Sequence, residues 1–292
     1  MMLSRGQVSI VIASPRPPRL LEACLASVMP QATEWNAPVI VARPGDARSV
    51  KAAIASAGPL GVAVAVDGSP TLPELRGAGL RAVQTPFAAL IEDHCVAAPG
   101  WLQALMAAMG TADFAGGRMG NAQRVRMADW AAYFAEYGFF TGRAVGGDPA
   151  LATGANVLYG PRALPLAAGW ATEGFWEDVI HARLIAAGCR LTLTAAAEIQ
   201  QNQRYEIADF CRDRFRHGFD YARTRLAEQP SLHRWIRAAT APLLPVVLAR
   251  RVGAGVAPED RGPFFRALPL TLTFLGGWAL GEMMGYIRGP AR

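Results

Sequence analysis

The chain has 292 residues, of which 52% are hydrophobic, and a net charge of +6. This length accommodates one large α/β domain or two ordinary ones, and the apolar fraction is sufficient for a sizeable core, which excludes disordered and fibrous proteins. Four cysteines without a Cys-x-x-Cys pair argue against a disulfide scaffold and against a zinc finger.

The positive charge is confined to the last third of the chain. Residues 1–200 contain 15 basic and 15 acidic side chains, whereas residues 201–292 contain 14 arginines and eight acidic side chains. A neutral body with a basic C-terminal part indicates that this part meets an anionic surface, either a nucleic acid or a membrane.

Strands and helices alternate in the first half of the sequence. Short apolar runs predict strands over Val8–Ala13, Ala37–Ala42, Gly61–Val66 and Pro86–Ile91. Helical spacing of apolar residues predicts helices over Leu20–Val28, Val50–Ala57, Leu72–Val83 and Trp101–Met109. The alternation predicts an α/β fold with a mostly parallel central sheet flanked by helices, in which ligands bind outside the carboxyl ends of the strands.

The second half is less regular, and it becomes rich in arginine and helix formers after Gln200. The pattern predicts helices over Ala128–Phe134, Val179–Ala187 and Ile207–Ala227, a loop at Gly146–Pro149 and a strand over Leu191–Ala195. A C-terminal helical extension therefore follows the α/β part.

The N-terminal segment Met1–Gln7 leads directly into the first strand, and the five-residue apolar run there is too short for a signal peptide. We therefore expect a cytoplasmic protein. Its four cysteines, expected to be unpaired, fit a reducing compartment: Cys24, Cys95, Cys189 and Cys211.

Glu92, Asp93 and His94 directly follow the fourth predicted strand. A carboxylate and an imidazole two residues apart in an extended turn can both reach one divalent cation, and Mn²⁺ accepts this mixed set of oxygen and nitrogen ligands. The other interpretation is a solvated strand-to-helix turn with no ligand.

Glu177 and Asp178 open the predicted helix Val179–Ala187. A carboxylate in the first helical turn is stabilised in its ionised form by the helix dipole, so it can serve as a general base. It can equally be an ordinary N-terminal capping residue.

Taken together, these clusters resemble those of family 2 glycosyltransferases, which have the GT-A fold. The similar segments, in the family's order over about 200 residues, are Val8–Pro15, Arg76–Leu80, Ala88–Trp101, Gly154–Asn156 and Trp176–Asp178 followed by Arg183, Leu184 and Gly188. The family transfers a sugar from a nucleoside diphosphate to an acceptor hydroxyl, usually with inversion. The resemblance therefore implies a metal-assisted glycosyltransferase.

The resemblance also implies roles for individual residues. Glu92 and His94 would hold a Mn or Mg cation that neutralises the leaving diphosphate, and Asp93 would face the ribose or the metal. Asp178 would deprotonate the acceptor, with Glu177 orienting the base or the acceptor. The remaining residues implied to bind substrate are Ser14, Pro15, Arg76, Asn156, Trp176 and Arg214.

The chain departs from the family pattern at the positions that bind the nucleotide. The acid expected after the second strand is displaced in Ala42–Asp46, and Gly77 stands where the family has Asn. The first turn also lacks the usual Tyr-Asn. A UDP-sugar is therefore only the default donor, and the alternative is a non-catalytic, membrane-docked module that binds a sugar nucleotide or a carrier lipid.

Gly77–Ala82 also satisfies the Gly-x-Gly-x-x-Ala pattern of dinucleotide-binding proteins. That motif must follow a strand at once and open a helix, yet the third predicted strand ends about ten residues earlier. The pattern therefore favours the glycosyltransferase interpretation.

The C-terminal part contains two uncharged runs, Ala238–Ala249 and Ala267–Gly281. Both are shorter than the about 20 apolar residues that a bilayer span needs, which favours interfacial or re-entrant helices over spanning ones. The expected domains are a GT-A catalytic domain over 1–205, with a nucleotide half to about 110 and an acceptor half over about 111–205, and a membrane-association segment over 206–292. We therefore expect a protein at the cytoplasmic face of the cell membrane with a lipid-linked or glycan acceptor and no nucleic-acid partner.

Overall fold

The computed structural model describes residues 5–140, 152–225 and 231–289, so the predicted loop at Gly146–Pro149 lies outside the described residues. The chain forms two compact units. The first, the α/β body, comprises residues 1–120 and 144–202, and the second, the helical unit, comprises residues 121–143 and 203–292. Residues 121–143, which sequence reasoning places in the acceptor half, thus group with the C-terminal helices by contact. The expected boundary near residue 205, between a catalytic domain and a membrane-association segment, stays a prediction.

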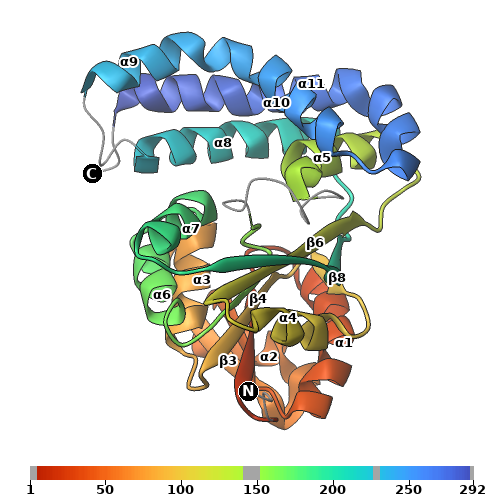
Figure 1. Cartoon of the computed structure of the whole chain (residues 1–292), viewed down its shortest axis with the longest axis vertical. Coiled ribbons are helices and arrows are strands. Elements are labelled where there is room, and N and C mark those ends of the chain that lie inside the picture. Colours follow the sequence, from red (N-terminus) through yellow and green to blue (C-terminus); the bar gives the residue numbers. More distant parts are fainter. Residues whose placement is uncertain (1–4, 141–151, 226–230, 290–292) are drawn as a thin grey trace. The chain divides into compact units, whose positions relative to one another are not determined.

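The body is built on one eight-stranded mixed sheet with the order β3-β2-β1-β4-β7-β6-β8-β5 (Figure 1). Its strands are β1 (Val8–Ala13), β2 (Val39–Pro44), β3 (Gly61–Val66), β4 (Phe87–Glu92), β5 (Cys95–Ala97), β6 (Phe114–Asn121), β7 (Asn156–Tyr159) and β8 (Leu191–Gln201). Its helices are α1 (Pro18–Trp35), α2 (Ala47–Ala53), α3 (Leu72–Arg81), α4 (Trp101–Met109), α6 (Leu164–Thr172) and α7 (Glu177–Ala186), with a 3-10 turn at Ala55–Leu60.

The four N-terminal strands of the predicted sheet are confirmed, and they pair in parallel as β3-β2-β1-β4. The other half of the sheet contains antiparallel pairs, because β7 runs against both β4 and β6, and β5 runs against β8. In the register of β1 and β4, Ala13 lies opposite Glu92. The residues that follow these two strands therefore emerge side by side at the carboxyl edge of the sheet.

The core of the body lies on both faces of this sheet. Alternate strand residues such as Val11, Leu90 and Val157 pack against α3, α6 and α7 in one apolar cluster. Because strand side chains alternate between faces, Ile10 and Ile12 point to the opposite face, and they are fully buried as well. Burial of both faces explains why the central strands are continuous apolar runs.

Helix α3 contains the glycines of the apparent dinucleotide motif in its middle, not at its start. A Cβ on Gly77 would lie 2.5 Å from the backbone nitrogen of Thr172 in α6, and a Cβ on Gly79 would lie 2.5 Å from Val11 in β1. These glycines therefore allow close packing of α3, and the dinucleotide interpretation is excluded. The same contact explains why Gly77 replaces the Asn of the family pattern, since a side chain there would collide with α6.

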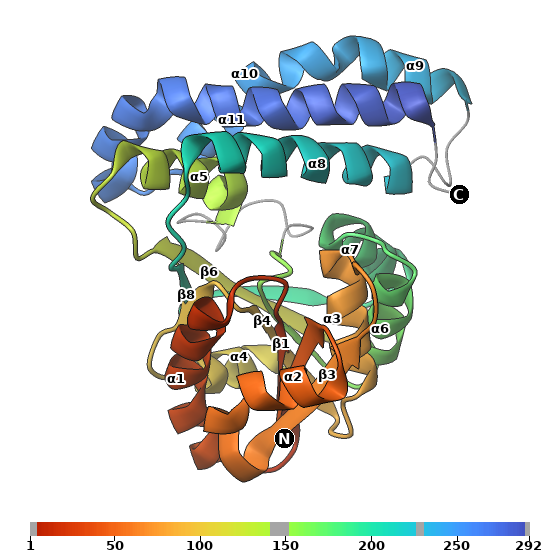
Figure 2. The ribbon, with the colours of Figure 1, turned by 180° about the vertical axis from the view of Figure 1, so that it is seen from behind.

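The helical unit contains α5 (Met127–Tyr137), α8 (Ile207–Arg225), α9 (Ser231–Thr240), α10 (Leu244–Gly255) and α11 (Arg261–Arg288), with 3-10 turns at Gly138–Phe140, Ala241–Leu243 and Pro258–Asp260. Within this unit α11 lies between α8 on one side and the consecutive helices α9 and α10 on the other (Figure 2). Helices α8 and α11 approach closely: a Cβ on Gly218 would lie 2.3 Å from the carbonyl oxygen of Trp278, and one on Gly281 would lie 2.0 Å from that of Phe215.

The two uncharged runs of the C-terminal part have different surroundings. The second run lies inside α11, where Phe274 and Leu275 are buried within the helical unit. The first run covers the end of α9, the 3-10 turn Ala241–Leu243 and the first half of α10, and it leaves several large apolar side chains exposed. Among the described residues, no helix combines the length and apolarity needed to cross a membrane.

Candidate active site at the carboxyl edge of the sheet

The turn after β1 and the acidic turn after β4 are joined by hydrogen bonds. The Ser14 hydroxyl donates to Asp93 Oδ2 at 2.9 Å, and the backbone N–H of Arg16 donates to the same oxygen at 2.9 Å. Ser14 and Asp93 are both buried. Burial raises the pKa of Asp93, but His94 and Arg16 beside it outweigh that effect and leave the pKa below its usual value. Asp93 is therefore an ionised, fixed acceptor at this edge.

Arg16 places its guanidinium beside all three residues of the acidic turn. Its guanidinium donates to His94 Nδ1 at 2.5 Å and lies 3.7 Å from Glu92 Oε2 and 3.9 Å from Asp93 Oδ1. Because a guanidinium can only donate, Nδ1 of His94 accepts in this contact, so a cation that binds Nδ1 has to displace the guanidinium. The sequence signals Arg16 only by its place directly after the predicted nucleotide-binding turn.

Arg76 connects the two acidic clusters of the predicted site. Its guanidinium donates from NH2 to Glu92 Oε1 and from NH1 to Glu177 Oε2, each at 2.5 Å. Burial raises the pKa values of both carboxyls. The opposing effects, of which the charge of Arg76 is the largest, together outweigh burial, so the pKa of each carboxyl ends below its ordinary value. The structure thus brings together the metal motif and the start of α7, two segments 85 residues apart, through one buried arginine.

The segment Gly154–Asn156 packs against Arg76 and bonds to the neighbouring strands. A Cβ on Gly154 would lie 2.6 Å from Cζ of Arg76, so only glycine leaves room for the guanidinium. Asn156 is fully buried: its amide donates to the carbonyls of Arg118 and Ala197, and its Oδ1 accepts from the indole of Trp101. The predicted contact between Asn156 and the substrate is therefore corrected, because both amide hydrogens already tie strands together.

The start of α7 presents the predicted base. Glu177 and Asp178 occupy its first turn, as the sequence indicates, and Asp178 is partly exposed. Trp176 is largely buried, and Cζ of Arg76 lies 6.0 Å from the centre of its ring. Glu177 is held by Arg76, which stabilises its charged form and makes it a poor proton acceptor. Of the two acids, Asp178 is the better candidate for a general base.

The acidic turn can hold a divalent cation only if other molecules supply part of its ligands. Asp93 Oδ1 is buried and has no hydrogen-bond partner among the described residues, and the His94 ring lies beside it. Glu92 is engaged by Arg76, and residues 5–140, 152–225 and 231–289 contain no group of three or more His, Cys, Asp or Glu side chains that could hold a metal by themselves. Asp93 and His94 therefore fit a cation whose other ligands come from a substrate.

The end of β2 differs from the expected nucleotide-reading site. Arg43 donates to the Ser14 hydroxyl at 2.8 Å and to the carbonyl oxygen of Arg16 at 2.7 Å, so it braces the turn after β1. Asp46, the displaced acid, caps α2 by accepting from the backbone N–H groups of Arg48 and Ser49. The acid expected to bind the nucleotide base after β2 therefore has no equivalent here, because Asp46 is engaged as the N-terminal cap of α2.

Two predicted substrate residues differ from the rest in their surroundings. Pro15 is exposed in the turn after β1. Arg214 belongs to the helical unit, where it is buried on α8 with Cζ 4.4 Å from the ring of Trp278. Burial lowers the pKa of Arg214, and its Nε has no hydrogen-bond partner among the described residues. Its contact with a substrate stays a prediction.

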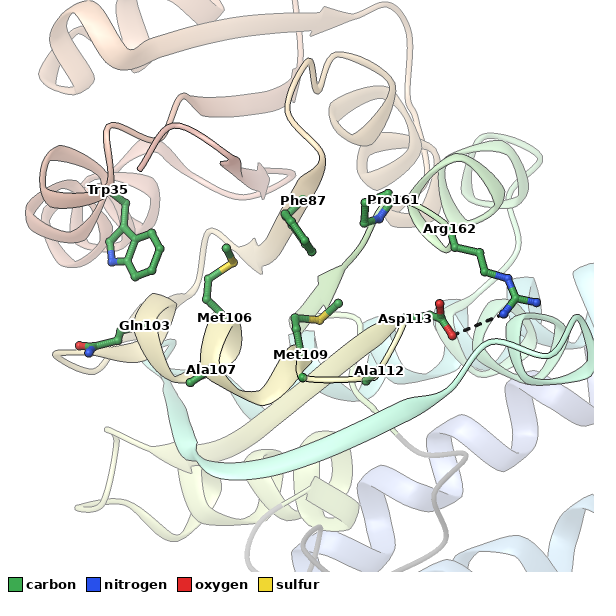
Figure 3. Close-up of a pocket in the computed structure, with 11 residues that line it drawn as sticks. Trp35, Phe87, Gln103, Met106, Ala107, Met109, Ala112, Asp113, Pro161 and Arg162 are labelled. Carbon is green, nitrogen blue, oxygen red and sulfur yellow. Dashed lines mark ion pairs between the residues drawn. The ribbon is translucent and has the colours of Figure 1, made fainter. Parts of the chain in front are cut away.

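A separate pocket of about 580 Å³ opens at the opposite, amino edge of the sheet (Figure 3). Trp35, Phe87 and Met106 line it, and an ion pair between Asp113 and Arg162, 3.7 Å apart, stands at one end. Phe87 is the first residue of β4, whereas the acidic turn follows the last. This pocket therefore lies at the other edge of the sheet and is separate from the acidic site.

Comparison with known proteins supports the fold. No family model and no curated protein matches the sequence. The structure is similar to that of the mannosyltransferase PcManGT from Pyrobaculum calidifontis in complex with GDP-Man and Mn²⁺, with 13% identity, a TM-score of 0.58 and coverage of 96% of this chain and 87% of that chain. It is also similar to glucosyl-3-phosphoglycerate synthase from Mycobacterium tuberculosis, with 11% identity, a TM-score of 0.49 and coverage of 71% and 76%.

Only the first of these scores exceeds 0.5, so the fold assignment rests on the mannosyltransferase. The body has the α/β GT-A fold that the sequence predicts, and a C-terminal helical extension follows it. At 13% identity this likeness establishes the fold, and the argument for function depends on the side chains of the acidic site.

Proposed function

We propose that the protein is a glycosyltransferase that moves a sugar from a nucleoside-diphosphate donor to an acceptor hydroxyl. The observation that carries this proposal is the Glu92–Arg76–Glu177 bridge, in which one buried guanidinium joins the candidate diphosphate site to the first turn of α7, where the candidate base Asp178 lies. The site lies outside the carboxyl ends of β1 and β4, where α/β sheets bind ligands. The likeness to a mannosyltransferase with GDP-Man and Mn²⁺ bound agrees with this class of reaction.

In this proposal the donor diphosphate binds at the acidic turn with Mn²⁺ or Mg²⁺. Asp93 and His94 would hold the cation, which supplies charge neutralisation for the leaving nucleoside diphosphate. Glu92, predicted from sequence as a ligand together with His94, instead has the role of fixing Arg76. The nucleotide of the donor is UDP by default. Membership of glycosyltransferase family 2 is part of the proposal.

The acceptor half of the proposed mechanism depends on α7. Asp178 takes the proton from the acceptor hydroxyl as that oxygen attacks the anomeric carbon of the sugar. Glu177, locked by Arg76, orients the acceptor without competing for the proton. Attack by the acceptor itself from the face opposite the leaving group inverts the anomeric configuration.

We infer that the acceptor is lipid-linked or lies close to a membrane, at the cytoplasmic face, and that nucleic acid is not a partner. The support is the excess of arginine in residues 201–292 together with the exposed apolar side chains of the helical unit. A free glycan acceptor is the variant of this proposal that does not need a membrane.

A non-catalytic binding module is the second candidate, because Arg43 and Gly77 replace residues that the family uses on the nucleotide. A screen of common nucleotide sugars with and without Mn²⁺, read as released nucleoside diphosphate, separates the two. The glycosyltransferase proposal expects cation-dependent release from at least one donor. Tight binding of a donor with no release or transfer, under conditions where an acceptor extract is supplied, would favour the binding module.

A further inference from the structure

Helices α9 and α10 carry a continuous stripe of exposed apolar side chains, which we call the α9–α10 ridge. Its members recur at helical spacing and are 43–67% exposed: Leu232, Trp235, Ile236, Leu243, Val246 and Val247. In an ordinary surface helix these positions are polar, and the apolar face is turned to the core. Here Ala238, Ala241 and Ala249 supply the face that is buried, so the larger apolar side chains face outward.

The ridge contains no negative charge. Residues 229–258 hold no Asp or Glu, whereas Arg234, Arg237, Arg250 and Arg251 lie along the same two helices. Arg250 and Arg251 are exposed, and Cζ of Arg234 lies 4.6 Å from the ring centre of Trp235. Exposed cations thus follow within about one helical turn of the last residue of the stripe, and Arg234 lies among the apolar residues of α9, a pattern expected where lipid headgroups surround an inserted apolar face.

Other exposed apolar residues of the helical unit stand singly beside arginines, as Val125 and Phe265 do, or share their helix with an acid. Ile207 on α8 is 48% exposed, close to the 53% of Ile236, but Glu206 and Asp209 flank it. Phe274 and Leu275, in the second uncharged run, are buried. The combination of a continuous apolar stripe with arginine and no acid therefore distinguishes the ridge within its own unit.

We propose that the α9–α10 ridge binds an anionic phospholipid bilayer, with its two helices lying in the plane of the interface. Among the described residues no helix is suited to span the bilayer, so insertion is limited to the ridge side chains. Trp235 is the residue type that prefers the headgroup level, and the arginines attract negatively charged lipids.

Flotation with vesicles tests this inference on the full chain. We expect binding to vesicles of phosphatidylcholine and phosphatidylglycerol, weak binding to phosphatidylcholine alone, and loss of binding as salt increases. Ile236→Ser should weaken binding about tenfold or more, whereas Ile207→Ser, the matched control of similar exposure in the same unit, should leave it unchanged. Removing both charges in Arg250→Gln/Arg251→Gln should cost about 25-fold, and Arg19→Gln on the body should cost nothing measurable.

Equal binding to neutral and anionic vesicles, or equal effects of Ile236→Ser and Ile207→Ser, would overturn the inference. So would a dimer that forms without lipid and dissociates in Ile236→Ser, because a second copy of the chain would then cover the ridge. Circular dichroism confirms that these surface variants keep their helices. The inference deepens the membrane-proximal part of the proposed function. Its failure is distinguishable from failure of the proposed sugar transfer, since vesicle binding requires neither a sugar donor nor an acceptor.

Discussion

In most proteins charged side chains are exposed and large apolar side chains are buried. The α/β body departs from this pattern in its interior, and the helical unit departs from it at its surface. In the body, five ionisable side chains are almost completely buried, Arg76, Glu92, Asp93, His94 and His181, and the first four form one connected cluster. Within the described ranges the helical unit buries four charged side chains as well, Asp129, Arg214, Asp260 and Glu282, but on four separate elements. In the helical unit the departure is at the surface: of 16 exposed large hydrophobic residues among those described, 13 belong to this unit and three to the body. The two units therefore carry different kinds of function.

Both departures have a physical cost. Buried charges lose their hydration and persist only when they are paired, and exposed apolar patches promote association unless a partner covers them. The body compensates by linking its charges, as Arg76 does for Glu92 and Glu177. The helical unit has no such compensation at the α9–α10 ridge, which is why we assign that face to a lipid surface and the buried cluster to chemistry.

The largest expected effect concerns the buried charges of the body. Arg76→Met leaves Glu92 charged and buried with only the Arg16 guanidinium, 3.7 Å away, as a cationic partner, and should lower the free energy of unfolding by about 3–5 kcal/mol. Arg76→Met/Glu92→Gln removes the buried charge and should recover a large part of that loss. Chemical denaturation of both variants measures the difference. If the double variant were as unstable as the single one, the ion pair would not be what stabilises this cluster.

The second prediction concerns His181, which is buried on α7 with Nε2 2.8 Å from the Tyr159 hydroxyl. Burial lowers the pKa of His181 from 6.5 to about 4. Between these values the unfolded chain binds a proton that the folded chain does not, so stability falls as the pH falls through this window, by about 3 kcal/mol at most.

Denaturation curves at several pH values test this. His181→Gln should flatten the loss between pH 6.5 and 4, whereas His233→Gln, which replaces an exposed histidine of the helical unit, should not change it. An unchanged pH profile in His181→Gln would show that the acid sensitivity of the body arises elsewhere.

The third prediction concerns Arg16, whose guanidinium occupies the side of His94 and Asp93 that a cation would approach. Arg16→Gln removes this competing charge and should tighten Mn²⁺ binding about tenfold in the absence of nucleotide. Titration calorimetry measures the affinity, with Arg19→Gln, an exposed arginine of α1, as the control. Weaker Mn²⁺ binding in Arg16→Gln would contradict the placement of the cation at Asp93 and His94.

The parallel half of the sheet could be predicted from sequence because both of its faces are buried. Continuous apolar runs such as Val8–Ala13 have few alternatives to a central strand. Strand β6 was missed, since its sequence contains three glycines. One of them, Gly117, explains the composition: a Cβ there would lie 2.2 Å from the carbonyl oxygen of Ala197 and 2.3 Å from the Asn156 amide. Tertiary packing, which local sequence does not reveal, selected glycine over a strand-forming residue.

The candidate site could be predicted as two acidic clusters but not as one connected network. Glu92 and Glu177 were each selected from their places at the ends of predicted elements, yet nothing in the spacing indicates that one arginine holds both. Arg16 and Arg43 were not selected, because an arginine after a strand looks like any solvated residue until its partners are known. Asn156 was selected by resemblance, and only its three hydrogen bonds identify it as structural.

The most direct test of the proposed chemistry is the rate of sugar transfer by Asp178→Asn compared with Glu173→Gln, an exposed acid just before α7. The proposed mechanism predicts that Asp178→Asn lowers the turnover rate about a thousandfold while nucleotide binding persists, because only the proton acceptor is lost. Glu173→Gln should transfer at the wild-type rate. Transfer by Asp178→Asn at the wild-type rate would contradict the assignment of the base and, with it, the division of labour between the acidic turn and α7.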